Sequence, residues 1–324
     1  MALAAPPRVC SRAVLLLEKR SWLQIVWTMH GSALPRIWRR LLATFAVACA
    51  VTVAHDQWGL LHSSLSPLPF SLIGVALGVF LGFRNNASYD RYWEARKLWG
   101  QLVNVSRTLA RRTTTYLVST GADEAEANSA IHACLGRTVA FAHLLRMHLR
   151  GEWNPTSIES LVNVNEFATI EGASNRPQAL LSFLGRSYRA AWKRGWIDTL
   201  HVPLFEECLA SMADVQGGSE RIRSTPIPSS YTILMHQIVA VYCFTLPFGI
   251  VSEVHEFTPF VVLLISFAFL GLDAIGEEIE EPFGRDANDL PLSAICHTIE
   301  TDLRAMRGDK LLPSAPAPVA GVVH

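Results

Sequence analysis

Charged side chains are scarce in this sequence of 324 residues. Asp, Glu, Lys and Arg make up 17% of the chain, and half of the residues are hydrophobic. A typical soluble domain carries about 25% charged residues, so the chain is more apolar than an ordinary soluble protein. Its formal net charge is zero. The composition therefore gives no excess of Lys and Arg for binding phosphates, and we expect no nucleic-acid partner.

The sequence also lacks the usual motifs of metal sites and catalysis. Its six cysteines lie far apart without a C-x-x-C pair, which argues against a disulfide framework or a zinc site. We find no glycine-rich phosphate loop, no pattern of alternating strands and no obvious Ser-His-Asp or Cys-His arrangement. His143 and His148 are five residues apart rather than the four of a helical metal pair. We expect neither an enzyme nor a bound cofactor.

Lys and Arg are absent from two long stretches, residues 41–83 and 224–284. Each stretch is long enough for two membrane spans with a short connection, because one span needs about 20 residues. The flanking segments are basic, so the positive-inside rule places both termini and the middle of the chain in the cytoplasm. A soluble helical protein with two buried hairpins is the alternative. We disfavour it because residues 257–272 contain no charged or amide side chain.

This pattern divides the chain into six segments of a multi-pass protein of the cell membrane. They are a cytoplasmic N-terminal segment (1–40), membrane helices one and two (41–83), a cytoplasmic helical region (84–231), membrane helices three and four (232–276), a cytoplasmic C-terminal segment (277–308) and a disordered Pro/Ala-rich tail (309–324). His236, Gln237 and Asp273 interrupt the apolar spans. Polar groups in lipid need protein partners, so we expect a bundle or an oligomer.

The middle region has the spacing of apolar residues that is typical of α-helices. Helices are expected over 125–153, 174–197 and 201–216, with breaks at Asn154–Pro155 and Gly217–Gly218. The predicted fold class is therefore all-α. Farther along, Asp286, Asn288 and Asp289 follow a Pro-Phe-Gly turn. They suit a cation site or the cap of the helix that follows, and the spacing alone favours the cap.

Four stretches resemble the bestrophin family, and its bacterial homologues in particular. They read FLGFRNNASYDRYWEARKLWGQL (80–102), WTMHGSALPRI (27–37), STPIPSSYTILMHQIV (224–239) and EEPFGRDANDLPL (280–292). The resemblance runs in order over about residues 20–308. It implies a homo-pentameric ion channel in a lipid membrane, with four membrane helices per subunit, a large helical cytoplasmic region and small inorganic ions as its cargo.

The resemblance also implies where ions would pass. In the family, the second membrane helix lines a central pore, and three apolar residues at i, i+4 and i+8 form a narrow neck. The matching residues here are Leu68, Leu72 and Ala76. Ala76 is smaller than the side chain usual in the family, which leaves Val75, Val79 or Phe80 as further contributors. Lipid contact or helix packing is the alternative role for this face.

A second constriction in the family is an apolar residue that follows a proline at a helix start. Leu204 is the matching candidate, with Ile227 as the fallback. Animal members bind calcium around the Pro-Phe-Gly turn. This chain keeps Asp286 and Asp289 but differs from that ligand set at Glu278, Glu281, Arg285 and Asn288. We therefore expect no calcium requirement and no resident metal.

Ion selectivity stays open between monovalent cations and chloride. Asp56, Glu253 and Glu256 on the outer connections slightly favour cations, whereas basic residues of the cytoplasmic region favour anions. A non-conducting membrane scaffold that binds a partner through its cytoplasmic helices is the alternative function.

The second membrane helix runs into a charged segment without a break. In GVFLGFRNNASYDRYWEARKLWG, Gly78 and Gly82 would allow close helix approach. Arg84, Arg91 and Glu94 are interpreted as the part that couples the neck to the cytoplasmic helices. We expect i, i+3 ion pairs that join Glu94 to Arg91 and to Lys97.

Overall fold

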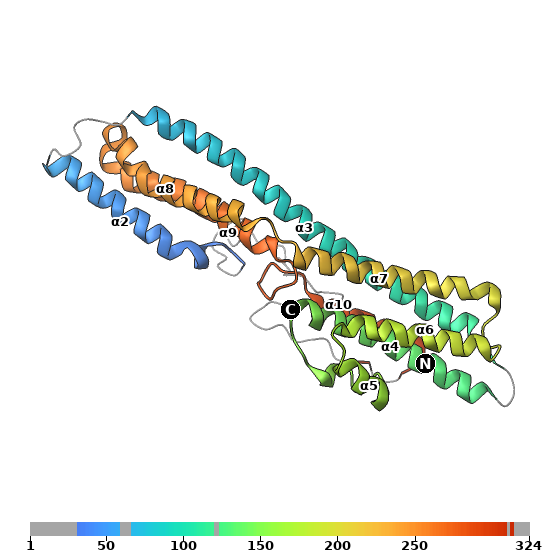
Figure 1. Cartoon of the computed structure of the whole chain (residues 1–324). Helices are drawn as coiled ribbons and strands as arrows, with labels where there is room; N and C mark the ends of the chain where they lie inside the picture. The colour runs from blue at the N-terminus through green and yellow to red at the C-terminus, as the bar shows by residue number, and fades with distance from the viewer. Residues whose placement is uncertain (1–30, 59–65, 120–122, 310–311, 314–324) are drawn as a thin grey trace, which may run out of the picture.

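The chain forms two helix bundles that lie end to end in an elongated molecule (Figure 1). The structure is a computed structural model that describes residues 31–58, 66–119, 123–309 and 312–313. Within these ranges the regular structure is helical, without strands. The all-α prediction is confirmed. The first 30 residues and most of the tail predicted to be disordered (309–324) lie outside the described residues.

Nine α-helices are described, with short 3-10 helices in some of the connections. The α-helices are α2 (Leu34–Trp58), α3 (Pro67–Tyr116), α4 (Glu124–Arg150), α5 (Val164–Glu171), α6 (Arg176–Lys193), α7 (Val202–Ser224), α8 (Ser229–Val254), α9 (Thr258–Glu280) and α10 (Leu292–Arg307), and the 3-10 helices are η2 (Pro155–Ser157), η3 (Thr199–His201) and η4 (His255–Phe257).

Helix α3 is one continuous helix of 50 residues that belongs to both bundles. The Ser66 hydroxyl accepts a hydrogen bond from the Leu68 amide, and Pro67 occupies the first turn, where a missing N–H costs nothing. A helix of this length spans about 75 Å, against about 30 Å for the hydrocarbon core of a bilayer. Its C-terminal half must therefore lie outside the membrane, as the charges after residue 83 predict.

The first bundle consists of α2, the N-terminal half of α3, α8 and α9. Its core is apolar and includes Ile37, Leu41, Leu81 and Leu246. Three stretches of the described chain are long and apolar enough to cross a membrane: α2, α3, and residues 229–280, which combine α8, η4 and α9. Their length and composition agree with the membrane spans expected from the sequence, and the split of the third stretch into two spans stays a prediction.

Helices α8 and α9 fold back on each other through a tight turn at His255. This residue has φ = 48° and ψ = −127°, and it is the only non-glycine residue with positive φ in the described parts of the chain. The turn reverses the chain after α8, so that α8 and α9 run antiparallel beside α2 and α3 (Figure 1).

The second bundle combines the C-terminal half of α3 with α4, α6, α7 and α10 around Trp99, Phe141 and Phe205. The break predicted at Gly217–Gly218 is wrong, because α7 continues through both glycines to Ser224. A Cβ on Gly218 would lie 2.9 Å from Leu98 of α3. Gly218 therefore allows the two helices to approach closely. The break predicted at Asn154–Pro155 is confirmed.

Candidate functional site

The residues predicted to form the neck lie on one uncovered face of α3. Leu68 is 65% exposed and Leu72 is 64% exposed, and Ala76 is exposed as well. The opposite face carries Leu77 and Leu81, which are buried against the rest of the membrane bundle. Residues at i, i+4 and i+8 share a helix face. This exposed face is apolar, and it belongs to a helix that is apolar enough to cross a membrane.

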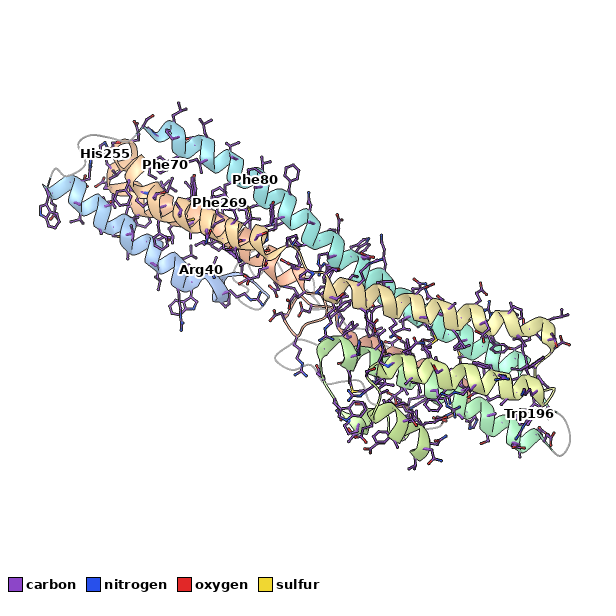
Figure 2. All side chains as sticks on the ribbon, in the orientation of Figure 1. Arg40, Phe70, Phe80, Trp196, His255 and Phe269 are labelled. Atoms are coloured by element: carbon purple, nitrogen blue, oxygen red, sulfur yellow. The ribbon has the colours of Figure 1, made fainter. Side chains whose placement is uncertain are left out.

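The same helix is the least covered of the membrane helices. Only 17% of its most apolar window is buried, against 33% for α2 and 44% for residues 229–280. Val75, Val79 and Phe80 are also exposed, and Figure 2 shows Phe80 pointing away from the membrane bundle. Among the described residues, no atom other than those of the helix's own backbone lies within 4 Å of a Cβ built on Gly78 or Gly82. The close approach expected at these glycines is therefore not made by the described parts of one chain.

A buried charged cluster ties α3 to α8 and α9 where the two bundles meet. The Arg84 side chain is fully buried, and its Nη1 donates to Asp273 Oδ1 at 2.5 Å. His236 Nδ1 lies 2.6 Å from the other oxygen, Asp273 Oδ2. Glu280 Oε2 is 3.9 Å from Arg84 Nη2. Both oxygens of Asp273 are occupied by these contacts. Asp273 of α9 thus joins Arg84 of α3 and His236 of α8, and the three residues form a structural link between the three helices.

Helix α3 continues the link into the second bundle through Arg91 and Glu94. Arg91 donates to three backbone carbonyls, those of Ile222 at 2.6 Å, Glu280 at 3.2 Å and Thr225. Glu94 forms an ion pair with Arg221 of α7. The i, i+3 pairs expected along α3 are therefore replaced by contacts across helices. Lys97 instead lies over the Trp93 ring, with its Nζ 5.9 Å from the ring centre.

The region around the Pro-Phe-Gly turn holds a guanidinium in the midst of its acidic groups. Arg36 Nη1 is 3.3 Å from Glu278 Oε2, and Arg36 Nη2 is 2.8 Å from Asp286 Oδ2. Asn288 Nδ2 donates to Glu278 Oε1 at 3.1 Å and to the Gly31 carbonyl at 3.2 Å. One guanidinium thus already contacts two of these carboxylates and places a positive charge among the oxygen ligands, which does not suit a calcium ion.

The Asp289 side chain closes the loop that follows the Pro-Phe-Gly turn. Its Oδ2 accepts a hydrogen bond from the Asp286 amide at 2.6 Å, and burial raises the pKa of this carboxyl to about 7. A Cβ on Gly284 would lie 2.4 Å from the same oxygen, so only glycine leaves room for it. The expected helix cap is wrong: the N-cap residue of α10 is Pro291, and no side chain caps it.

The candidates for a second constriction lie in different places. Leu204 is in the first turn of α7, at the end of the molecule farthest from the membrane bundle (Figure 1). Its carbonyl accepts a hydrogen bond from Arg112 near the end of α3. Ile227 lies between α7 and α8, and its amide donates to Glu280 Oε1 at 3.2 Å. Leu204 and Ile227 are both partly exposed.

The sequence shows that polar residues interrupt the apolar spans, but it does not predict the buried charged cluster that these residues form. His236 and Asp273 are 37 positions apart and were not expected to meet each other or Arg84. The usable signal was the need of each polar group in lipid for a partner. Arg36 was counted only as a basic flank of the first span, and no local pattern connects it to Glu278 and Asp286.

Comparison with known proteins identifies the family. Residues 15–305 match the family described as bacterial/fungal bestrophin protein. The voltage-dependent anion channel-forming protein YneE of Salmonella typhi is 36% identical over 305 residues, which cover 94% of this chain and 98% of the relative. The voltage-dependent anion channel-forming protein RSc3414 of Ralstonia nicotianae is 39% identical over 291 residues, which cover 90% of this chain and 94% of the relative.

Solved structures agree with the sequence matches. The crystal structure of a point variant of a bacterial bestrophin homologue from Klebsiella pneumoniae superimposes with a TM-score of 0.78 at 35% identity, and the match covers 85% of this chain and 100% of the homologue. The relatives are named as channel-forming proteins, in keeping with the expectation of a protein that is not an enzyme. On sequence and on structure, the chain belongs to the bacterial/fungal bestrophin family.

Proposed function

We propose that the protein is a homo-pentameric channel of the cell membrane that passes small monovalent ions through a central pore lined by α3. The observation that carries this proposal is the uncovered apolar face of Leu68, Leu72 and Ala76, opposite the buried face of the same helix. Five copies of α3 around an axis would cover this face and leave a narrow apolar passage. Apolar constrictions of this kind gate by expelling water.

Anions are the proposed cargo, with chloride as the test ion. The names of the relatives from Salmonella typhi and Ralstonia nicotianae favour anions. Asp56, Glu253 and Glu256 are exposed at the far end of the membrane bundle and favour cations. Charge at a pore mouth mainly changes the local concentration of ions, and the proposed neck itself is uncharged. The names of the relatives therefore count for more in this proposal than the three acidic residues.

The deciding experiment is a reversal-potential measurement on purified protein in planar bilayers with a potassium chloride gradient. An anion channel gives a reversal potential near the chloride equilibrium potential, and a cation channel gives the opposite sign. Leu72→Ala should increase the current because it widens and wets the neck. If neither protein passes current, a non-conducting scaffold replaces the channel proposal.

We also propose that Arg84, Arg91 and Glu94 couple the neck to the cytoplasmic bundle. The support is that these three residues of α3 contact α7, α9 and the backbone before α8. Glu94→Ala should change the open probability while the protein stays assembled. Asp302→Ala is the matched control, because Asp302 also pairs with an arginine of α3, Arg107, away from both candidate constrictions. Unchanged gating in Glu94→Ala would contradict the coupling.

Calcium is proposed to have no part in activation, because Arg36 already forms ion pairs with Glu278 and Asp286. Currents should be the same in a calcium chelator and in millimolar calcium. Arg36→Gln removes the guanidinium from the acidic groups, so a calcium response that appears only in this variant would support the role given to Arg36. Steep activation of the unmodified protein by calcium would contradict it.

A further inference from the structure

Three side chains with metal-binding atoms meet at the end of the membrane bundle farthest from the cytoplasmic helices. They are His55 and Asp56 in the last turn of α2 and His255 in the turn between α8 and α9. One ligand atom of each lies within 4.8 Å of the other two. Figure 2 labels His255 at this end, beside the end of α2. The two helical segments are far apart in the sequence, so the fold alone brings these donors together.

The donor set has the chemistry of a transition-metal site. Two imidazoles and one carboxylate bind Zn²⁺ in many proteins, at about 2.0 to 2.2 Å, with water as the fourth ligand of an open site. In such a tetrahedron the ligand atoms are about 3.4 Å apart, so small side-chain rotations would complete the site. His55 and His255 already face each other, with ring centres 6.1 Å apart. All three residues are at least partly exposed, so an ion in solution has access.

The backbone at His255 supports a role for its side chain. Its φ of 48° and ψ of −127° belong to a turn position that glycine adopts without strain and that other residues rarely occupy. The Thr258 hydroxyl holds this turn by donating to the His255 carbonyl at 2.6 Å. Glycine would fit this backbone conformation better than histidine. A functional role of the imidazole would account for the strained backbone at this position.

We propose that His55, Asp56 and His255 form a divalent transition-metal site of the zinc type, which clamps the end of α2 to the α8–α9 turn. Glu253 and Glu256 flank His255 in the chain and add negative charge that attracts a cation. Calcium and magnesium prefer oxygen ligands and should not compete. The proposal does not depend on ion conduction.

The test is zinc binding to the purified full-length protein, stripped of metal with a chelator and titrated by competition with a fluorescent zinc indicator. We expect one Zn²⁺ per chain and at least about tenfold weaker binding in His55→Ala and in Asp56→Asn, because each variant removes a ligand. His132→Ala is the matched control, since it removes an exposed histidine of α4 that is far from the cluster in the fold. Binding of equal strength in all four proteins would overturn the proposal.

His255→Gly separates metal binding from folding. Glycine relieves the strained backbone, so this variant should melt at the same temperature as the metal-free unmodified protein or above it. It should also lose the rise in melting temperature that Zn²⁺ gives the unmodified protein through binding to the folded state. A full zinc-dependent rise in His255→Gly, or no rise in the unmodified protein, would overturn the site. Calcium at the same concentration should leave both melting temperatures unchanged.

Discussion

At the scale of single residues, the molecule concentrates its buried charge where the two bundles meet. Arg84 is fully buried, and the short contact to Asp273 gives it a counter-charge. Its Nε and Nη2 atoms find no hydrogen-bond acceptor among the described residues. Because an unpaired charge in an apolar interior is costly, the contact between the two bundles at Arg84 depends most on Asp273.

Asp273→Ala should destabilise the folded protein by about 3 to 5 kcal/mol, the cost typical of removing one partner of a buried ion pair. The double variant Arg84→Met/Asp273→Ala should recover part of that loss, because the buried guanidinium is removed together with its main partner, whereas Glu280 then loses its contact with Arg84. Thermal unfolding in detergent measures both. Asp302→Ala is the control: it breaks an exposed pair with Arg107 and should cost at most about 1 kcal/mol. A loss in Asp273→Ala no larger than in this control would contradict the role of the pair.

Asp289 makes a pH-dependent contribution to stability. Its pKa rises from 3.8 to about 7 through burial, so the folded state holds the proton more tightly than the unfolded state does. A raised acid pKa means that stability is fully present below the unfolded value and is lost as pH rises through the folded value. The loss should fall between about pH 4 and pH 7, and should amount to about 1 to 2 kcal/mol because solvent still reaches the carboxyl.

Asp289→Asn tests this titration, because an asparagine oxygen can still accept the Asp286 amide while the side chain no longer ionises. The variant should match the unmodified protein near about pH 4 and should be the more stable of the two near about pH 8. Melting curves across this range measure the difference. Parallel curves for the two proteins would show that the carboxyl keeps an ordinary pKa.

At the scale of elements, small residues decide how closely helices pack. Gly218 of α7 lies against Leu98 of α3, whereas a Cβ on the neighbouring Gly217 would meet nothing within 4 Å. Both glycines lie inside the same helix. A larger residue at Gly218 would therefore have to displace the Leu98 side chain, whereas Gly217 only lowers helix propensity.

The two glycines should respond in opposite directions to substitution. Gly217→Ala should stabilise the protein by about 0.5 to 1 kcal/mol, the usual gain from replacing an unconstrained helical glycine. Gly218→Leu should destabilise it by about 1 to 3 kcal/mol, because the larger side chain forces α7 away from α3. Thermal unfolding of the two variants side by side provides the measurement. Equal effects would show that the α3–α7 contact is loose.

The helices themselves were largely predictable from the sequence, and the contacts between them were not. The continuous helix through Arg84 followed from the absence of proline between the apolar and charged halves of α3. The continuation of α7 through Gly217–Gly218 could not be predicted, because a glycine pair is typical of a helix break and the packing of Gly218 against Leu98 is not visible in the sequence. The link of Arg84, Asp273 and His236 depends on three helices and has no local signal. The family resemblance supplied the proposed neck, and composition alone assigned that face to lipid or packing.

At the scale of the whole molecule, a single chain leaves much of α3 without cover. The exposed side chains on this helix include Leu68, Leu72 and Phe80, and the small Gly78 and Gly82 lie open beside them. Large apolar side chains can face lipid, but glycines four apart on a membrane helix are typical of helix–helix contact. The open glycines therefore indicate where α3 of a second subunit would approach.

Gly82→Leu should break the assembly into smaller species while each chain keeps its own fold. The reason is that, among the described residues, only the backbone of the helix itself lies near a Cβ at this position, so the leucine side chain extends into space that a neighbouring subunit would occupy. Native mass spectrometry of the detergent-solubilised protein gives the subunit count, and circular dichroism reports the fold. Gly100→Leu, equally open but in the cytoplasmic half of α3, is the control for added bulk and should stay assembled. If Gly82 faces lipid instead, leucine is harmless there, and an unchanged subunit count in this variant would exclude α3 around residue 82 from the subunit interface.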